Sequence, residues 1–285
     1  MKLNKTEQRS HAFSDPNIYT IGEKIIPKEL YKYYSASRVQ DVLINKELVF
    51  VSPNLWKDSF EKRYLDTDFT DLGLKQPKIY CMCFATKVEN EEAEWKFYSY
   101  KKKMIIRCRI NIEPLFEILS DFAQKNDVHI FIGNANYELL KKEIQFLHLP
   151  KSKNFGSYFE NFSLDKYMKL MTLKPKERKN ENEFRIFVVP KNEDHNSEVI
   201  FKIPIPEDKY DTLFSNFMVQ PFENAYSDNP KDLKYMEDSF QAMREIFADK
   251  LLSLYPHAKI DNYKQFDRYR AVNKLSLKLD RNISK

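Results

Sequence analysis

The sequence predicts an α+β protein built on a mixed, mainly antiparallel sheet that opens with a strand–helix–strand unit. Short apolar runs rich in β-branched and aromatic residues alternate with longer segments of helical periodicity. Hydrophobic residues make up 42% of the 285 residues and aromatic residues 14%, which is enough for a packed core. Helical insertions are expected between the strands, and a long amphipathic helix over 231–254 is expected near the end of the chain.

The opening unit is expected over residues 30–53. The tyrosine-rich run 30–35 predicts the first strand, and the capping-box pattern that begins at Ser37 predicts a short helix. The β-branched and aromatic run Leu48–Val51 predicts the second strand, which stops at Ser52-Pro53.

The remaining elements follow from periodicity and from turn residues. Further strands are expected over 79–85, 104–110, 129–132, 183–189 and 199–203. Further helices are expected over 91–100, 114–125, 136–147, 207–217 and 231–254.

The chain is expected to form a single α+β domain over 26–258, after a polar lead-in over 1–25. Hydrophobic runs continue on both sides of the irregular stretch 148–182, and no linker-like segment separates them. A basic segment follows over 259–285, where eight Lys and Arg outnumber three Asp. This segment is either a solvated terminus or an arm that binds nucleic acid through its phosphates.

Composition also excludes several classes of site. The four glycines lie far apart, so neither the Rossmann fingerprint nor a P-loop is present. Three cysteines do not make a disulfide framework and favour a reducing compartment, and no apolar run marks a signal or a membrane span, so we expect a cytoplasmic protein. No metal is expected, because Cys81 and Cys83 have no second ligand pair and the histidines are scattered.

Polar residues alternate with apolar ones in the late segment 181–189. On a strand, Glu181, Glu183 and Arg185 would share one face while apolar residues fill the other. Two interpretations stay open. The polar face is either a solvated surface or the floor of a cleft, where a carboxylate stabilises a cationic transition state or accepts a proton.

Candidate partners for such a cleft lie in the opening unit. The residues are Tyr31, Lys32, Tyr33 and Ser35 on the first strand, and Ser52, Trp56, Asp58 and Glu61 after the second. Because tryptophan usually packs, the segment that holds Trp56 is expected to fold back on the body of the domain.

Taken in order, these motifs resemble a bacterial family called domain of unknown function 2971. The matching segments are 31–33, 50–53, 58–61, 83–85, 95–98 and 181–185, so the resemblance spans about residues 30 to 205. The chain departs from the family pattern at Lys57, Ser59 and Ala85, where the family has Asn, Pro and Ser.

A looser likeness is to ADP-ribosyltransferases, which also open with strand–helix–strand and place a catalytic Glu in a late Glu-x-Glu. This likeness implies NAD as substrate, with Glu183 as catalytic carboxylate and Glu181 orienting the acceptor. It also implies an NAD-binding set in which Tyr33 stacks on nicotinamide and Ser52 holds ribose, completed by Tyr31, Lys32, Ser35 and Arg185.

Three functions are therefore compared. The first is an ADP-ribosyltransferase-like enzyme, a toxin or phage-defence effector that modifies nucleic acid or protein. The second is a non-catalytic nucleic-acid-binding or interaction protein that uses the basic segment 259–285. The third is another enzyme class, such as a nuclease, although no metal-nuclease motif follows a predicted strand.

Overall fold

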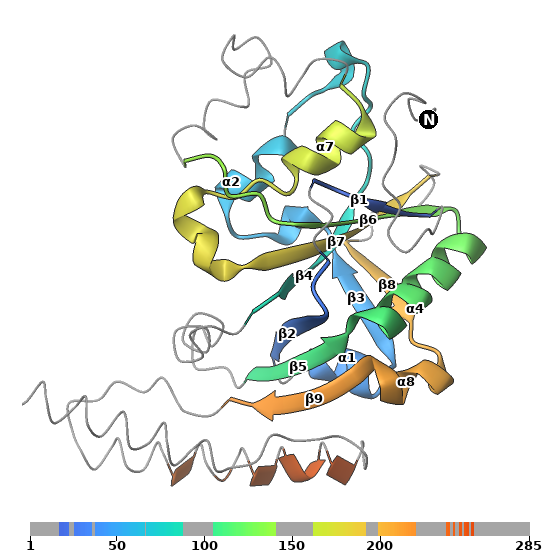
Figure 1. Ribbon diagram of the computed structural model, residues 1–285, viewed down its shortest axis with the longest axis vertical. Helices are drawn as coiled ribbons and strands as arrows, with labels where there is room; N and C mark the ends of the chain where they lie inside the picture. Colours follow the sequence, from blue (N-terminus) through green and yellow to red (C-terminus); the bar gives the residue numbers. More distant parts are fainter. Residues whose placement is uncertain are drawn as a thin grey trace, which may run out of the picture.

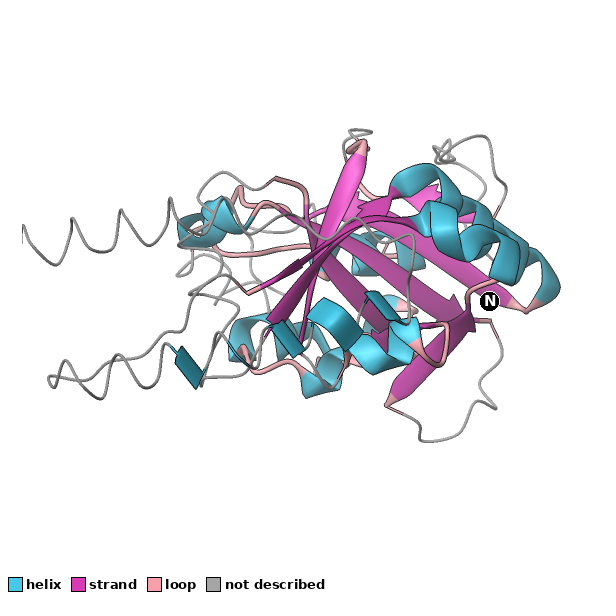
Figure 2. Cartoon of the chain, turned by 90° about the horizontal axis from the view of Figure 1, so that it is seen from below, coloured by secondary structure: helices cyan, strands magenta, loops and turns pink. Residues whose placement is uncertain are grey.

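The fold is that of a computed structural model, which describes most of the chain in seven continuous segments. These are residues 17–22, 26–35, 38–65, 67–87, 105–140, 162–191 and 199–220, with separate positions 238–239, 242, 245–246, 248–250 and 252–253. Within them one sheet carries helices on both of its faces (Figures 1 and 2). In these residues no helix is long and apolar enough to cross a membrane.

The strands are β1 (Ile18–Thr20), β2 (Glu29–Ser35), β3 (Glu47–Val51), β4 (Tyr80–Ala85), β5 (Ile105–Asn111), β6 (Val128–Asn134), β7 (Glu183–Pro190), β8 (Ile200–Pro204) and β9 (Phe214–Val219). The α-helices are α1 (Val39–Leu43), α2 (Ser59–Lys62), α4 (Ile112–Lys125), α7 (Leu164–Leu170) and α8 (Glu207–Leu213). Four short 3₁₀ helices connect them: η2 (Pro53–Leu55), η3 (Arg63–Leu65), η4 (Thr70–Leu72) and η6 (Lys176–Glu181).

The strand order is β1-β6-β7-β4-β2-β5-β9; off this path, β3 pairs with β4, and β8 pairs with β3. Every pairing in this sheet is antiparallel except that of β1 with β6. The predicted α+β class is confirmed, and the predicted strand–helix–strand unit is present as β2–α1–β3, although β1 precedes it in the chain.

The sheet forks beside β4. One edge of β4 pairs with β7 along its whole length. Its other edge pairs with β2 only at Tyr31–Ala85 and with β3 only at Val51–Cys81. Because β2 and β3 diverge between these two points, the middle of β4 has no continuous neighbour strand on this side (Figure 1).

Strand β7 separates the two hydrophobic cores, because successive strand residues point to opposite faces. Phe184 and Ile186 belong to the core under α1, α4 and α8. Phe187 and Val189 belong to the core under α7 and the η3–η4 segment. All eight residues of β7 are buried, so the strand forms the centre of the molecule.

Most predicted strands are present within a residue or two of their expected bounds, but the helix predictions are met less well. The helix expected over 136–147 is absent from residues 136–140, where Asn136 makes a bridge with Leu173, and its remainder, 141–147, lies outside the described residues. The expected helix over 207–217 ends at Leu213, because the following residues pair with β5 as strand β9. The helix expected over 91–100 lies outside the described residues.

The predictions for the two ends of the chain agree only in part with the structure. A loose lead-in was expected over 1–25, yet Ile18–Thr20 form β1 and pair in parallel with β6. Every described position between 238 and 253 is helical, in agreement with the long helix expected over 231–254. The basic segment 259–285 lies outside the described residues.

The contact between Gly133 and the end of β1 provides a test of this edge of the sheet. A Cβ at Gly133 would lie 2.7 Å from the carbonyl oxygen of Ile21, whose backbone N–H donates to Ile132. We expect Gly133→Ala to lower the free energy of unfolding by about 1–3 kcal/mol, because the backbone must shift to admit the methyl group. Urea unfolding measures this loss of stability, with Gln124→Ala on the exposed face of α4 as control. Equal stability of G133A and the wild type would contradict the close contact.

Candidate functional site

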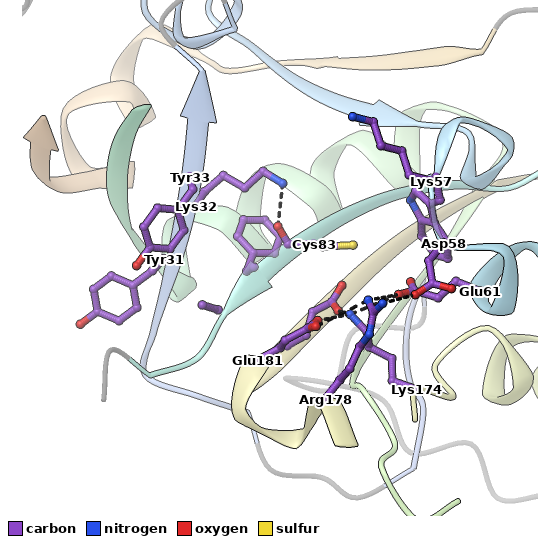
Figure 3. Close-up of a pocket in the computed structure, with 14 residues that line it drawn as sticks. Tyr31, Lys32, Tyr33, Lys57, Asp58, Glu61, Cys83, Lys174, Arg178 and Glu181 are labelled. Carbon is purple, nitrogen blue, oxygen red and sulfur yellow. Dashed lines mark hydrogen bonds and ion pairs between the residues drawn. The ribbon is translucent and has the colours of Figure 1, made fainter. Parts of the chain in front are cut away.

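A pocket of about 270 Å³ lies where the sheet forks. Figure 3 shows residues of β2 on one side of it and a group of charged side chains on the other, with Cys83 of β4 between them. The lining residues come from β2, the η2–α2 segment, β4, the segment that ends in η6, and β7: Tyr31, Lys32, Tyr33, Trp56, Lys57, Asp58, Glu61, Cys83, Phe84, Ala85, Lys174, Arg178, Glu181 and Glu183.

The charged group, which we call the charged cluster, consists of four carboxylates and three cations. Its members are Asp58, Glu61, Lys174, Arg178, Glu181, Glu183 and Arg185. They come from three segments that are distant in the sequence: α2 and the residue before it, the stretch 174–181, and β7.

Arg185 lies at the base of this cluster and is fully buried. Its guanidinium donates to Glu61 at 2.5 Å, to both carboxylate oxygens of Glu183 at 3.1 and 3.2 Å, and to the carbonyl oxygen of Met171 at 2.6 Å. The ring of Trp56 covers it, with the guanidinium carbon 4.6 Å from the ring centroid. These contacts join β7 to α2, to the end of α7 and to the end of η2.

Lys174 is the second buried cation. Its ammonium group pairs with Glu181 and Glu183, and it lies 3.3 Å from Glu61. Burial alone would lower the pKa of Lys174, but the negative charges of Glu183, Glu61 and Glu181 outweigh burial and raise it. Lys174 therefore stays charged and balances carboxylates from three different elements.

Glu183 is ionised although it is buried. Burial alone would raise the pKa of this carboxyl, but the charges and hydrogen bonds of Arg185, together with the charge of Lys174, lower it well below its ordinary value. The cluster as a whole has four carboxylates facing three cations, and Lys57, next to Asp58 in the chain, adds a further cation to the pocket lining.

The opposite wall is aromatic and basic. The ammonium group of Lys32 donates to the carbonyl oxygen of Cys83 at 2.6 Å, in the part of β4 that the fork leaves without a continuous partner strand. It also lies 5.9 Å from the ring centroid of Tyr34 and 5.6 Å from that of Phe84. Lys32 thus occupies the fork and presents positive charge to the pocket.

Cys83 stands between the two walls. Its sulfur lies 3.6 Å from that of Cys81. The contact with Cys81, burial and the charge of Glu183 raise the pKa of Cys83, so this thiol is protonated at neutral pH.

Five of the predicted site residues line the pocket: Glu181, Glu183, Tyr31, Lys32 and Tyr33.

The pocket lining does not include Arg185, Ser35 or Ser52. Arg185 lies beneath the charged wall, and Ser35 ends β2. Ser52 is buried at the start of η2, where its hydroxyl accepts from the backbone N–H of Asn54 at 3.3 Å. The hydroxyl of Ser52 therefore has a local structural partner.

Two expectations about the late polar segment are corrected. Glu181 was expected on the strand but belongs to η6, and Asn182 in left-handed conformation, with φ of 43°, separates it from β7. The interpretation as a solvated surface does not hold, because Glu183 is only 8% exposed and Arg185 is fully buried. The polar face is instead part of a pocket.

Sequence reasoning missed Lys174 and Arg178 as site residues. Both belong to the stretch 173–182, whose many charges suggest a solvated loop. The carboxylates that they meet include Asp58 and Glu61 of a distant segment. The signal that points to them is the co-occurrence of this charged stretch with the acidic box at 58–61.

No protein-family model, curated protein or solved structure matches this chain. The described residues also contain no group of three or more His, Cys, Asp or Glu side chains arranged to hold a metal ion. In the charged cluster, the positions between the carboxylates are taken by Lys174 and Arg178.

The cost of removing Arg185 tests its role in the cluster. We expect Arg185→Met to lower the free energy of unfolding by about 3–5 kcal/mol, because Glu61 and Glu183 stay buried with one of their cations gone. The matched control is Arg38→Met, which removes an exposed pair with Asp41 and should cost less than about 1 kcal/mol. Urea unfolding at neutral pH measures both, and equal effects would contradict the assigned role.

The lowered pKa of Glu183 predicts how stability changes with pH. A depressed folded pKa stabilises the fold above the ordinary carboxyl value of 4.5, and this stabilisation is lost as the pH falls below that value. We expect Glu183→Gln to be less stable than the wild type by about 3 kcal/mol at neutral pH. This difference should shrink steadily as the pH falls below 4.5.

Chemical denaturation across the acid range measures this difference, with Glu138→Gln at an exposed position as control. The control should differ from the wild type by less than about 0.5 kcal/mol at neutral pH. A gap between the wild type and E183Q that stays constant with pH would show that Glu183 is not held in its ionised form.

Proposed function

We propose that the pocket is the active site of an ADP-ribosyltransferase-like enzyme that uses NAD as its substrate. The observation that carries this proposal is that ionised Glu183 lines the same pocket as Tyr33 and Lys32 of the opening unit. Five residues of the looser resemblance thus meet at one pocket, namely Tyr31, Lys32, Tyr33, Glu181 and Glu183, whereas Ser35, Ser52 and Arg185 are not part of its lining. The motifs shared with the domain of unknown function 2971 support the same location, because the acidic box supplies Asp58 and Glu61.

The two walls of the pocket suit a substrate with separated charges. NAD carries a positively charged nicotinamide ring on one ribose and a negatively charged pyrophosphate beyond it. The carboxylates of the charged cluster would face the cationic part, and cations of the lining, Lys32 among them, would face the phosphates. Aromatic residues of the lining, such as Trp56, offer flat surfaces for a base or a nicotinamide ring.

Glu183 would stabilise the charge that develops during the reaction. As the bond from C1′ of the ribose to the nicotinamide nitrogen breaks, nicotinamide leaves with the electron pair and the ribose becomes cationic. A fixed carboxylate beside C1′ lowers the energy of this cation. A nucleophile of the acceptor, or water, then bonds to C1′ and releases its proton.

Glu181 would orient the acceptor, since it lines the pocket from η6 beside Glu183. The acceptor would be a nucleic acid or a protein, and the biological role that of a toxin or a phage-defence effector in the cytoplasm. This role follows from the resemblance, while the site assignment follows from the pocket.

Turnover of labelled NAD tests the proposal. We expect the wild type, with cell lysate as a source of acceptor, to release nicotinamide and to label an acceptor with ADP-ribose. Glu183→Gln should reduce both activities about 10²–10³-fold, because the charge next to the reacting carbon is lost. Glu181→Gln should reduce labelling of the acceptor more than release of nicotinamide.

Glu138→Gln serves as the control of equal charge change, and circular dichroism verifies that every variant is folded at the assay temperature. If NAD is neither bound nor consumed by the folded wild-type protein in the presence of lysate, the proposed function is wrong.

A further inference from the structure

The three cations of the charged cluster differ in how firmly they are held. The side chain of Arg185 is 1% exposed and that of Lys174 is 5% exposed, whereas that of Arg178 is 42% exposed. Arg185 lies beneath the pocket, and Lys174 is surrounded by three carboxylates. Arg178 is therefore the member of the cluster that is best placed to meet an incoming ligand.

Two of the three carboxylates near Arg178 also have a second cationic partner. Its guanidinium lies 2.6 Å from Asp58, 3.7 Å from Glu181 and 3.9 Å from Glu61. Glu181 also pairs with Lys174, and Glu61 pairs with both Lys174 and Arg185.

If Arg178 turned away, Glu61 and Glu181 would thus keep buried cationic partners. The contact that changes most is the one with Asp58, whose side chain is 13% exposed and which would then need another hydrogen-bond donor, such as water.

An arginine in this position suits a phosphate group. A planar guanidinium can donate two parallel hydrogen bonds to phosphate oxygens. In the structure the nearest anion to the guanidinium of Arg178 is the carboxylate of Asp58, at 2.6 Å. Lys57 and Lys32 line the same pocket, so an anion that enters it meets positive charge from other elements as well.

We propose that Arg178 is the phosphate-recognising residue of this pocket and that it exchanges Asp58 for a phosphate group of the ligand. In this exchange Asp58 acts as a competitor that occupies the guanidinium in the absence of ligand. The inference rests on the proposed function for the identity of the ligand, a dinucleotide with a pyrophosphate. The exchange itself depends only on the charges of the pocket.

Two substitutions with opposite expected effects test the exchange. Arg178→Gln should weaken the binding of inorganic pyrophosphate and of ADP-ribose at least 10-fold, because the phosphate loses its bidentate partner. Asp58→Asn should strengthen the binding of both several-fold, because the competing carboxylate is gone. A purely structural role for this ion pair predicts weaker binding in both variants.

Isothermal titration calorimetry of the full chain measures these affinities. Arg38→Gln, which breaks an exposed Arg–Asp pair away from the pocket lining, is the matched control and should bind like the wild type. If only ADP-ribose binds, and its affinity follows the expected pattern, Arg178 recognises a phosphate carried by a nucleotide. If only pyrophosphate binds in this pattern, Arg178 recognises free phosphate or pyrophosphate. If the wild type binds neither pyrophosphate nor ADP-ribose, the inference is overturned.

The outcomes separate this inference from the proposed function. If pyrophosphate binding follows the expected pattern while NAD is not consumed, the phosphate site stands and the reaction does not. If the wild type consumes NAD and Arg178→Gln has the same KM and the same pyrophosphate affinity, the reaction stands and the role of Arg178 is refuted.

Discussion

The buried guanidinium of Arg185 is the interaction on which the architecture of the pocket depends. An arginine cannot shed its charge inside a protein, so a fully buried one must find anionic partners and acceptors. Burial alone would lower the pKa of Arg185, but Glu183 and Glu61 raise it, so the charge is secure. Because its partners lie on α2, on β7 and at the end of α7, satisfying this one cation brings those elements to one place.

The fork of the sheet supplies the open space that the cluster lines. A continuous strand beside β4 would fill the edge where the pocket lies, but β2 and β3 each pair with β4 at a single position. Lys32 satisfies the carbonyl oxygen of Cys83 in this gap. A backbone carbonyl group at the interruption of the β-ladder needs a hydrogen-bond donor, and the donor here is a cation opposite the acidic wall. The charge separation across the pocket therefore follows from the fold.

The sequence predicted the strands because their side-chain period is local, and it missed what depends on distant partners. The apolar positions Phe184 and Ile186 alternate visibly, so β7 and its inward face could be recognised. Strand β1 is three residues long and is defined by its pairing with β6, which no local pattern reveals. The resemblance predicted Glu183 and Tyr33 as site residues. The burial of Lys174 could not be predicted, because its partner Glu61 lies in an acidic box that is distant in the sequence.

The members of the charged cluster differ in burial, so under the proposed function the fold and the ligand would depend on different residues. Arg185 and Lys174 are buried and hold Glu61 and Glu183 in place, so changes at these positions act first on the fold. Arg178 is half exposed, and Glu61 and Glu181, which lie near it, keep other cations. A ligand can therefore rearrange the rim of the pocket while the base of the cluster keeps its geometry. A site built this way positions Glu183 before the ligand arrives, which is the preorganisation that electrostatic stabilisation of a cationic transition state requires.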